Sequence, residues 1–232
     1  PVPSYVRPHM SSIAVLGATG NLGRHVARQA LAHDWRLSVA VRDRGRLAPE
    51  VSAQARVTDL DLSAATSRQI ASFAAGHEVF VSCAGVVSEG EAFVRLVDRV
   101  VSALETLGSD QRPVCWFLAG AALLPLDATG RMGVDLPKVR ETYWPHRKNF
   151  ERLQRSDLDW RLLCPGPMVE QPAIGLERLR IRTGSVIHNL GALLLTWFAG
   201  LAILFGLFFI ANPAIWSIRI EGTFINPLIL GY

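Results

Sequence analysis

Three glycines near the start of the chain have the spacing of a main-chain site for phosphate. They are Gly17, Gly20 and Gly23, and they directly follow the short apolar run Ser12–Leu16. In such a pattern the first glycine permits a tight turn, the second lets the main chain approach a diphosphate, and the third lets a helix pack closely on a strand. A helix beginning near Asn21 would point its free N–H groups and its positive dipole end at the phosphates.

Residues that follow the second apolar run, Arg36–Val41, indicate which nucleotide is bound. An arginine at this point accommodates the 2′-phosphate of NADP, whereas an acidic residue binds the 2′-hydroxyl of NAD. Arg42 comes first, and its guanidinium can contact a phosphate through two N–H groups. The sequence therefore favours NADP(H) over NAD(H). Asp43 keeps NAD(H) open if the strand ends one residue later, and a solvated surface charge is the alternative role for Arg42.

Apolar runs alternate with amphipathic segments along most of the chain, which predicts an α/β fold with a doubly wound parallel sheet and helices on both faces. Ligands of such sheets bind beyond the carboxyl ends of the strands. The expected strands are Ser12–Leu16, Arg36–Val41, Ala55–Thr58, Glu78–Ser82, Val114–Ala119 and Trp160–Cys164. The expected helices are Asn21–His33, Ser63–Ala75 with Ser63 as a cap, Glu89–Leu107, and Pro145–Arg155 with proline in its first turn.

This context of strand, glycine turn and helix favours a bound dinucleotide over a glycine-rich turn without a ligand. Asp59 and Leu60, after the third strand, are expected to border the adenine. Small residues after the fourth strand would let the main chain approach the cofactor. The expected cofactor contacts up to this point are Gly17, Thr19, Gly20, Asn21, Leu22, Gly23, Arg42, Asp59, Leu60, Cys83, Ala84 and Gly85.

Composition excludes several classes of protein. Half of the 232 residues are hydrophobic, which excludes a disordered chain. The net charge of +4 is small and its cations are scattered, so we expect no nucleic-acid partner. Three cysteines are too few for a disulfide scaffold, and all lie on or beside expected strands, so we interpret them as small core residues rather than nucleophiles. No metal ligands are expected.

The segments GATGNLG (17–23), Arg42, and SDLDWRLLCPGPM (156–168) together resemble the NAD(P)H-binding atypical short-chain dehydrogenases. Within that group the similarity is to the flavin and biliverdin reductase-like and NmrA-like proteins, and it spans about Ser12 to Glu170. The resemblance implies a Rossmann fold and hydride transfer from NADPH to a small conjugated or carbonyl substrate. Some relatives only sense the cofactor, and an isomerase or epimerase that keeps its cofactor bound is a further alternative.

The resemblance also implies cofactor contacts after the last two strands, at Ala119, Gly120, Pro165 and Gly166. Typical short-chain dehydrogenases have a serine after strand five and a Tyr-x-x-x-Lys helix. Here no hydroxyl follows strand five, and Arg147 rather than lysine lies four residues after Tyr143. The usual acid–base group therefore does not occur in its usual form.

Tyr143, His146 and Arg147 are nevertheless the best catalytic candidates. Tyr143 or His146 could supply a proton, since an unperturbed histidine titrates near neutrality. Arg147 would share a helix face with Tyr143 and could lower the pKa of its phenol. Pro145, however, argues against Tyr143 lying inside the helix. The structural alternative is that His146 and Asn149 cap and brace the helix start.

The last 44 residues differ in kind, because only Arg219 and Glu221 are charged beyond His188. Residues 190–211 carry no charge and are long enough to cross a bilayer. Arginines before them would keep the preceding domain in the cytoplasm, at the inner face of the membrane. Membrane attachment is favoured, and a substrate lid or a homodimer interface is the alternative. We expect added sequence at 1–9, a nucleotide-binding domain at 10–188 and an apolar segment at 189–232.

Overall fold

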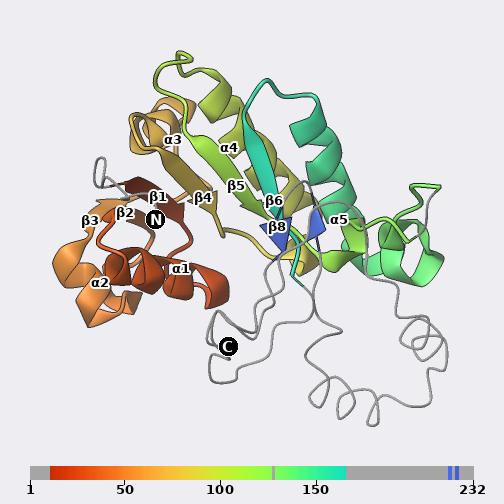
Figure 1. Cartoon of the computed structure of the whole chain (residues 1–232), viewed down its shortest axis with the longest axis horizontal. Coiled ribbons are helices and arrows are strands. Elements are labelled where there is room, and N and C mark those ends of the chain that lie inside the picture. The colour runs from red at the N-terminus through yellow and green to blue at the C-terminus, as the bar shows by residue number, and fades with distance from the viewer. Residues whose placement is uncertain (1–10, 127–128, 166–218, 221–222, 225–232) are drawn as a thin grey trace, which may run out of the picture. The chain divides into compact units, whose positions relative to one another are not determined.

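The computed structural model describes residues 11–126, 129–165, 219–220 and 223–224, and strands and helices alternate through most of them (Figure 1). The strands are β1 (Ser12–Leu16), β2 (Arg36–Val41), β3 (Arg56–Asp59), β4 (Val79–Ser82), β5 (Val114–Leu118) and β6 (Trp160–Leu163). The helices are α1 (Asn21–Ala32), α2 (Pro49–Gln54), α3 (Ser67–Ala74), α4 (Glu91–Glu105) and α5 (Pro137–Gln154).

Six strands form one parallel sheet in the order β3-β2-β1-β4-β5-β6. Leu16 is paired with Ala40 of β2 and with Ser82 of β4, so β1 lies between these two strands. The chain leaves β1 toward one edge and later returns to its other side, so the order reverses at β1 and β4. This is the Rossmann arrangement, in which ligands bind at that switch point. The predicted fold class is therefore confirmed.

Contacts divide the chain into two compact units. The first comprises Pro1–Gly85, Arg95–Trp116 and Ser156–Trp160, and the second comprises Val86–Val94, Phe117–Arg155 and Arg161–Tyr232. In the first unit α1 and α2 pack on one side of β1 and β2, where Val15, Ala27 and Val39 have no exposed surface. This apolar cluster fixes the strand ends from which the polar loops emerge.

The start of α3 differs from the prediction. The helix begins at Ser67 with Thr66 as its cap, and Thr66 and Gln69 exchange hydrogen bonds in a capping box. Ser63 is not the cap because Asp61 binds it in a local turn, accepting from both its main-chain N–H (3.0 Å) and its hydroxyl (2.8 Å). That turn satisfies Ser63 outside the helix.

The prediction that α5 begins at Pro145 is wrong. The helix begins at Pro137, and Pro145 lies inside it and is buried. Pro137 is suited to the first turn because its missing N–H would have no helical partner there. Pro145 removes one hydrogen bond inside the helix, yet the helix continues, and Tyr143 is therefore helical.

Smaller differences concern element ends and short elements. β3 runs to Asp59, so Asp59 is its last residue rather than the residue after it. The six-residue helix α2 was not predicted, since a single turn has too few residues to show helical periodicity. Near the C-terminus β7 (Arg219–Ile220) and β8 (Thr223–Phe224) form a two-stranded antiparallel pair.

Several predictions lie outside the described residues. They concern Gly166, the added sequence at 1–9, the boundary at 188, and the apolar stretch 190–211 with its membrane, lid or dimer role. Among the helices that the structure does describe, none combines the length and the apolarity needed to cross a membrane.

Candidate functional site

Two positions where β1 leads into α1 accept only glycine: Gly17 in the turn and Gly23 in the first turn of the helix. Gly17 has a φ of +77°, and a Cβ there would lie 2.8 Å from the carbonyl oxygen of Cys83 and 2.9 Å from the nitrogen of Ala84. A Cβ at Gly23 would overlap the carbonyl oxygen of Gly17. Any larger residue would therefore force the main chain apart at these positions.

The first turn of α1 presents main-chain groups without side-chain caps. Gly20 is the cap residue and is exposed, and within the described part of the chain no side-chain cap bonds to the start of the helix. The N–H of Gly20 itself bonds to the carbonyl of Gly17 at 3.0 Å, which closes the turn. Asn21 is exposed, whereas the Leu22 side chain is 2% exposed and belongs to the core. The N–H groups of Asn21, Leu22 and Gly23 are thus available to an anion.

The end of β4 lies directly against this turn. Cys83 donates its N–H to the carbonyl of Leu16 at 3.0 Å, and Gly85 follows with a φ of +91°. Together with the close approach of Gly17 to Cys83 and Ala84, this brings two of the predicted cofactor segments together at the switch point. A cradle of main-chain atoms without side chains fits the diphosphate of a dinucleotide.

The residues after β2 differ in the hydrogen bonds that they make. Arg42 directly follows the strand and is exposed. Asp43 caps a short 3-10 turn (Arg44–Arg46) by accepting the N–H of Gly45 at 2.9 Å. One carboxylate oxygen of the acidic residue that could bind a 2′-hydroxyl is therefore already bonded to the main chain.

Arg44 and Asp59 form a two-pronged ion pair on the surface. The guanidinium donates to both carboxylate oxygens of Asp59, at 2.7 and 2.9 Å, and to the carbonyl of Val57 at 3.2 Å. The hydrogen bond from Arg44 lowers the pKa of the Asp59 carboxyl. Asp59 thus remains anionic and attached to Arg44, and the neighbouring Leu60 is buried.

Cysteines in this structure are poor nucleophiles. Burial raises the pKa of Cys83 and of Cys115 to about 12, and it also raises the pKa of Cys164. A thiol with such a pKa is protonated at neutral pH, and the thiolate is the reactive form. The interpretation of the three cysteines as small packing residues agrees with this.

In the second unit, α5 carries His146 and Asn149 into the interior, where they are 8% and 7% exposed. The ring of Phe93 meets His146 edge-on at 5.7 Å between centroids. The ring of Tyr143, which is 39% exposed, is stacked with the imidazole, with centroids 6.2 Å apart and planes 11° apart. Two aromatic rings are therefore neighbours of His146.

Burial lowers the pKa of His146 to about 4, so the imidazole is neutral at pH 7. The value for an unperturbed histidine therefore does not apply to His146, because an imidazolium in this apolar surrounding would lose its hydration without gaining a counter-charge. The neutral ring can still donate or accept a hydrogen bond.

Gly120, two residues after the end of β5, explains how His146 fits. A Cβ on Gly120 would lie 3.1 Å from both Cδ2 and Nε2 of His146, closer than most real contacts. The lack of a side chain there, where typical relatives have a serine nearby, makes room for the imidazole. Ala121 donates its N–H to the carbonyl of Pro165 at 3.2 Å, and Ala119 to that of Leu163 at 2.7 Å. The predicted segments Ala119–Gly120 and Pro165 are therefore adjacent.

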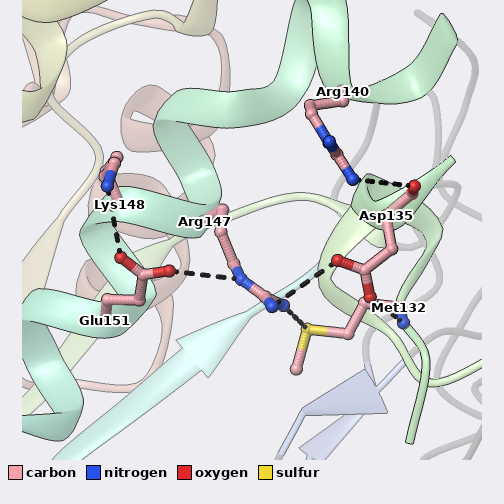
Figure 2. A network of polar contacts seen from close by, with 6 residues as sticks. All are labelled: Met132, Asp135, Arg140, Arg147, Lys148 and Glu151. Atoms are coloured by element: carbon pink, nitrogen blue, oxygen red, sulfur yellow. Dashed lines mark hydrogen bonds and ion pairs between the residues drawn. The ribbon is translucent and has the colours of Figure 1, made fainter. Parts of the chain in front are cut away.

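Arg147 faces a different set of partners (Figure 2). Its Nη1 donates to Sδ of Met132 at 3.0 Å, its Nη2 lies 3.5 Å from Oδ1 of Asp135, and its Nε lies 3.3 Å from Oε1 of Glu151. Lys148 also reaches Glu151, at 3.6 Å. The structure gives Arg147 these contacts rather than one with Tyr143, so it connects the loop before α5 to the helix instead of acting on the phenol.

The burial of Asn149 together with His146 was not predicted from the sequence. The two lie three residues apart and therefore share one face of a helix. That spacing is present in the sequence, but a helix that starts at Pro145 would place both residues near its cap. The observed start at Pro137 places them in the middle of α5 instead.

Comparison with known proteins agrees with this geometry. A family model described as NAD(P)H-binding matches residues 17–187, well over half of the chain. No curated protein sequence matches the chain.

Solved structures give the same picture. A protein from Burkholderia pseudomallei is 25% identical, with a TM-score of 0.61 over 78% of this chain and 84% of that one. A Streptococcus pneumoniae protein named as an NADH-flavin reductase is 16% identical, with a TM-score of 0.60 over 77% and 83%. A Rossmann-fold NAD(P)-binding family protein from Shigella flexneri is 15% identical, with a TM-score of 0.54 over 76% of each chain. The glycine cradle, the strand order and the family match together show that this chain belongs to the NAD(P)H-binding family, among the Rossmann-fold proteins similar to atypical short-chain dehydrogenases.

Proposed function

We propose that the protein is an NADP(H)-dependent reductase that transfers a hydride to a small conjugated or carbonyl substrate. The observation that carries the proposal is the glycine turn, where Gly17 and Gly23 leave room only for main chain and α1 begins with free N–H groups. When bound, NADPH supplies a hydride, which is two electrons with one proton, and the reduced acceptor takes a second proton from water or an acid. The family match supports the nicotinamide cofactor.

The preference for NADP(H) rests on the loop after β2. Arg42 is exposed at the first position beyond the strand, where a 2′-phosphate is expected. The nearby carboxylates Asp43, Asp59 and Asp61 accept hydrogen bonds from Gly45, Arg44 and Ser63, respectively. Each carboxylate thus already has a partner within the protein, whereas the exposed guanidinium of Arg42 supports binding of a phosphate.

On α5 the neutral His146 supports a role in binding an uncharged acceptor rather than in strong acid catalysis. Reduction of a flavin-like or quinone-like acceptor needs little acid–base help from the protein, because the acceptor itself delocalises the added electrons. The lack of a serine after β5 and of a tyrosine–lysine pair is compatible with such a substrate. The likeness in fold to a protein named as an NADH-flavin reductase agrees with this class.

The test is oxidation of NADPH, followed by its absorbance, with riboflavin and menadione as acceptors. We expect steady turnover with at least one acceptor, faster with NADPH than with NADH. The variant Gly20→Val is the matched control, because it should keep the fold but lose the cofactor. Tight NADPH binding without turnover on any acceptor would contradict the proposal.

A cofactor-sensing protein is the second candidate, and the side chains on α5 favour it. His146 is neutral and Arg147 is held by Asp135 and Glu151, so α5 presents no charged acid–base pair. A sensor would bind NADPH and change its conformation without consuming it. The turnover assay separates the two candidates directly.

A further inference from the structure

The guanidinium of Arg147 makes its shortest contact among the described residues with a sulfur atom (Figure 2). Its Nη1 donates to Sδ of Met132 at 3.0 Å, whereas oxygens of Asp135 and Glu151 lie at 3.5 and 3.3 Å. A thioether sulfur is a weak acceptor, and a guanidinium usually bonds to a carboxylate at about 2.7–2.9 Å. The position closest to the cation is therefore taken by the weakest of these three acceptors.

The main chain around Met132 fixes where this residue lies. Met132 pairs with Pro125 in an antiparallel bridge, and its N–H donates to Oδ2 of Asp135 at 2.7 Å. The next residue, Gly133, donates its N–H to the carbonyl of Leu124 at 3.1 Å. Met132 itself is half-buried, so it is partly accessible from solution. A small oxidant can therefore reach a side chain that is already positioned beside a cation.

Oxidation would turn this sulfur from a weak acceptor into a strong one. Hydrogen peroxide transfers one oxygen atom to the thioether, the sulfur loses two electrons, and the peroxide is reduced to water. The sulfoxide oxygen is polar, and its burial without a partner would be unfavourable. Beside Arg147 it meets a donor that is always charged, and hydrogen bonds to charged groups stabilise more than bonds between neutral groups.

We propose that Met132 is a site of reversible oxidation, at which the sulfoxide oxygen accepts a hydrogen bond from Arg147. This bond replaces the contact between Nη1 and the sulfur, and it strengthens the connection between the loop that carries Met132 and α5. Oxidation of a packed methionine usually disrupts its surroundings, whereas here the neighbouring cation makes the oxidised protein the more stable form. The inference concerns only this loop and α5, and it does not depend on the proposed reductase function.

The first test is treatment of the full chain with dilute hydrogen peroxide, followed by tryptic digestion and mass spectrometry. Trypsin cuts after Arg131 and Lys138, so Met132 is the only methionine in the peptide of residues 132–138. We expect this peptide to gain the mass of one oxygen atom, and to lose it after the treated protein is incubated with methionine sulfoxide reductases. An unmodified peptide from treated protein would overturn the proposal.

Thermal unfolding measures what the added oxygen does, with Met132→Leu, treated identically, as the matched control. Leucine is apolar and takes up no oxygen, so the effects of oxidation elsewhere in the chain are common to both proteins. Burial raises the pKa of Cys83 and Cys115 to about 12, so these thiols are protonated and react slowly with peroxide. Relative to the control, we expect oxidation to raise Tm by about 2–4 °C. No rise, or a fall, would overturn the proposal.

Arg147→Leu removes the donor to the sulfoxide. In this variant oxidation of Met132 should lower Tm, because the new oxygen has lost its charged partner. Lys148→Leu is the control, since Lys148 contacts Glu151 at 3.6 Å and is not bonded to Met132 in the described structure, and the rise should persist. A rise of wild-type size in Arg147→Leu would overturn the proposal. If that variant does not fold, the comparison with Met132→Leu still decides.

Discussion

The turn after β1 and the middle of α5 present polar groups in opposite ways. At the turn, Gly17 and Gly23 remove side chains so that main-chain N–H groups are presented. On α5, His146 and Asn149 lie in the middle of the helix and carry polar side-chain atoms into the protein interior. The main-chain site depends on a few consecutive residues, whereas the side-chain site depends on where the helix begins and which of its faces is buried.

This difference sets what each region can tolerate. Within the glycine turn, an added Cβ meets main-chain atoms, which cannot move without shifting β1 or β4. Around His146, the neighbours are the rings of Phe93 and Tyr143, and exposed Tyr143 can rotate. We therefore expect larger losses from changes in the turn than from changes on α5.

The largest effect is predicted for Gly20→Val. Gly20 has an ordinary extended conformation (φ −83°, ψ 174°), and an added Cβ would lie 3.3 Å from the carbonyl oxygen of Gly17, so valine requires only a small shift there, unlike a side chain at Gly17 or Gly23. The valine side chain would cover the first N–H groups of α1. We expect NADPH affinity to fall by at least about 100-fold, because several hydrogen bonds to charged phosphates are lost. Titration calorimetry measures the affinity, and circular dichroism checks that the fold is kept. Unchanged affinity in a folded variant would refute the role of this turn.

An effect of similar size is predicted for the pH dependence of stability caused by His146. Its pKa is about 4 when folded and about 6.5 when unfolded, so the unfolded chain binds the extra proton between these values. The stabilisation that neutral His146 contributes is complete above pH 6.5. As pH falls toward 4, the free energy of unfolding decreases by about 3 kcal/mol through this group.

His146→Gln isolates that contribution. Urea unfolding at pH 7 and pH 4 should show that the variant loses about 3 kcal/mol less than the wild type between the two values. Other acid-sensitive groups, including half-buried His77, are present in both proteins and cancel in the difference. Identical losses in the two proteins would show that His146 is not held neutral by burial.

A smaller effect is predicted for Arg42→Ala. Removal of the guanidinium should weaken NADPH binding about tenfold and leave NADH binding nearly unchanged, because only NADPH carries the 2′-phosphate. Arg36→Ala is the matched control, since Arg36 is an exposed arginine at the opposite end of β2. If the preference for NADPH survives Arg42→Ala, another residue recognises the phosphate.

The smallest effect is predicted for Arg147→Met. The variant removes partly exposed contacts to Met132, Asp135 and Glu151, and should destabilise the protein by about 1 kcal/mol, or 2–4 °C in Tm. Turnover should change little, because Arg147 connects the loop to the helix and does not act on Tyr143. Lys148→Met, which removes only the 3.6 Å contact to Glu151, should cost less. A large loss of kcat with unchanged Tm would instead indicate a catalytic arginine.

Much of the fold could be predicted from local pattern. β1 and β2 were predicted to the residue, and α1 to within one residue, because apolar runs and glycines mark their ends. The parallel sheet with helices on both faces followed from the alternation of strands and helices, whereas the order of its strands comes from the structure. The glycine turn followed from spacing, since each glycine there acts through the main chain.

The rest depended on contacts that no local pattern contains. Pro145 suggested a helix start, but Pro137 provides one eight residues earlier, and the long helix tolerates the interior proline. The environment of His146 depends on Gly120 and Phe93, which are distant in sequence. Its low pKa, and its burial together with Asn149, therefore become visible only in the folded chain.

The central claim is that main-chain groups between β1 and α1 bind the diphosphate of a nicotinamide dinucleotide. Calorimetric titration of the full wild-type chain with NADPH, and then with NADH, tests it most directly. The account predicts saturable binding of one NADPH per chain, tighter than the binding of NADH. No binding heat from either dinucleotide, with the protein shown to be folded, would contradict it.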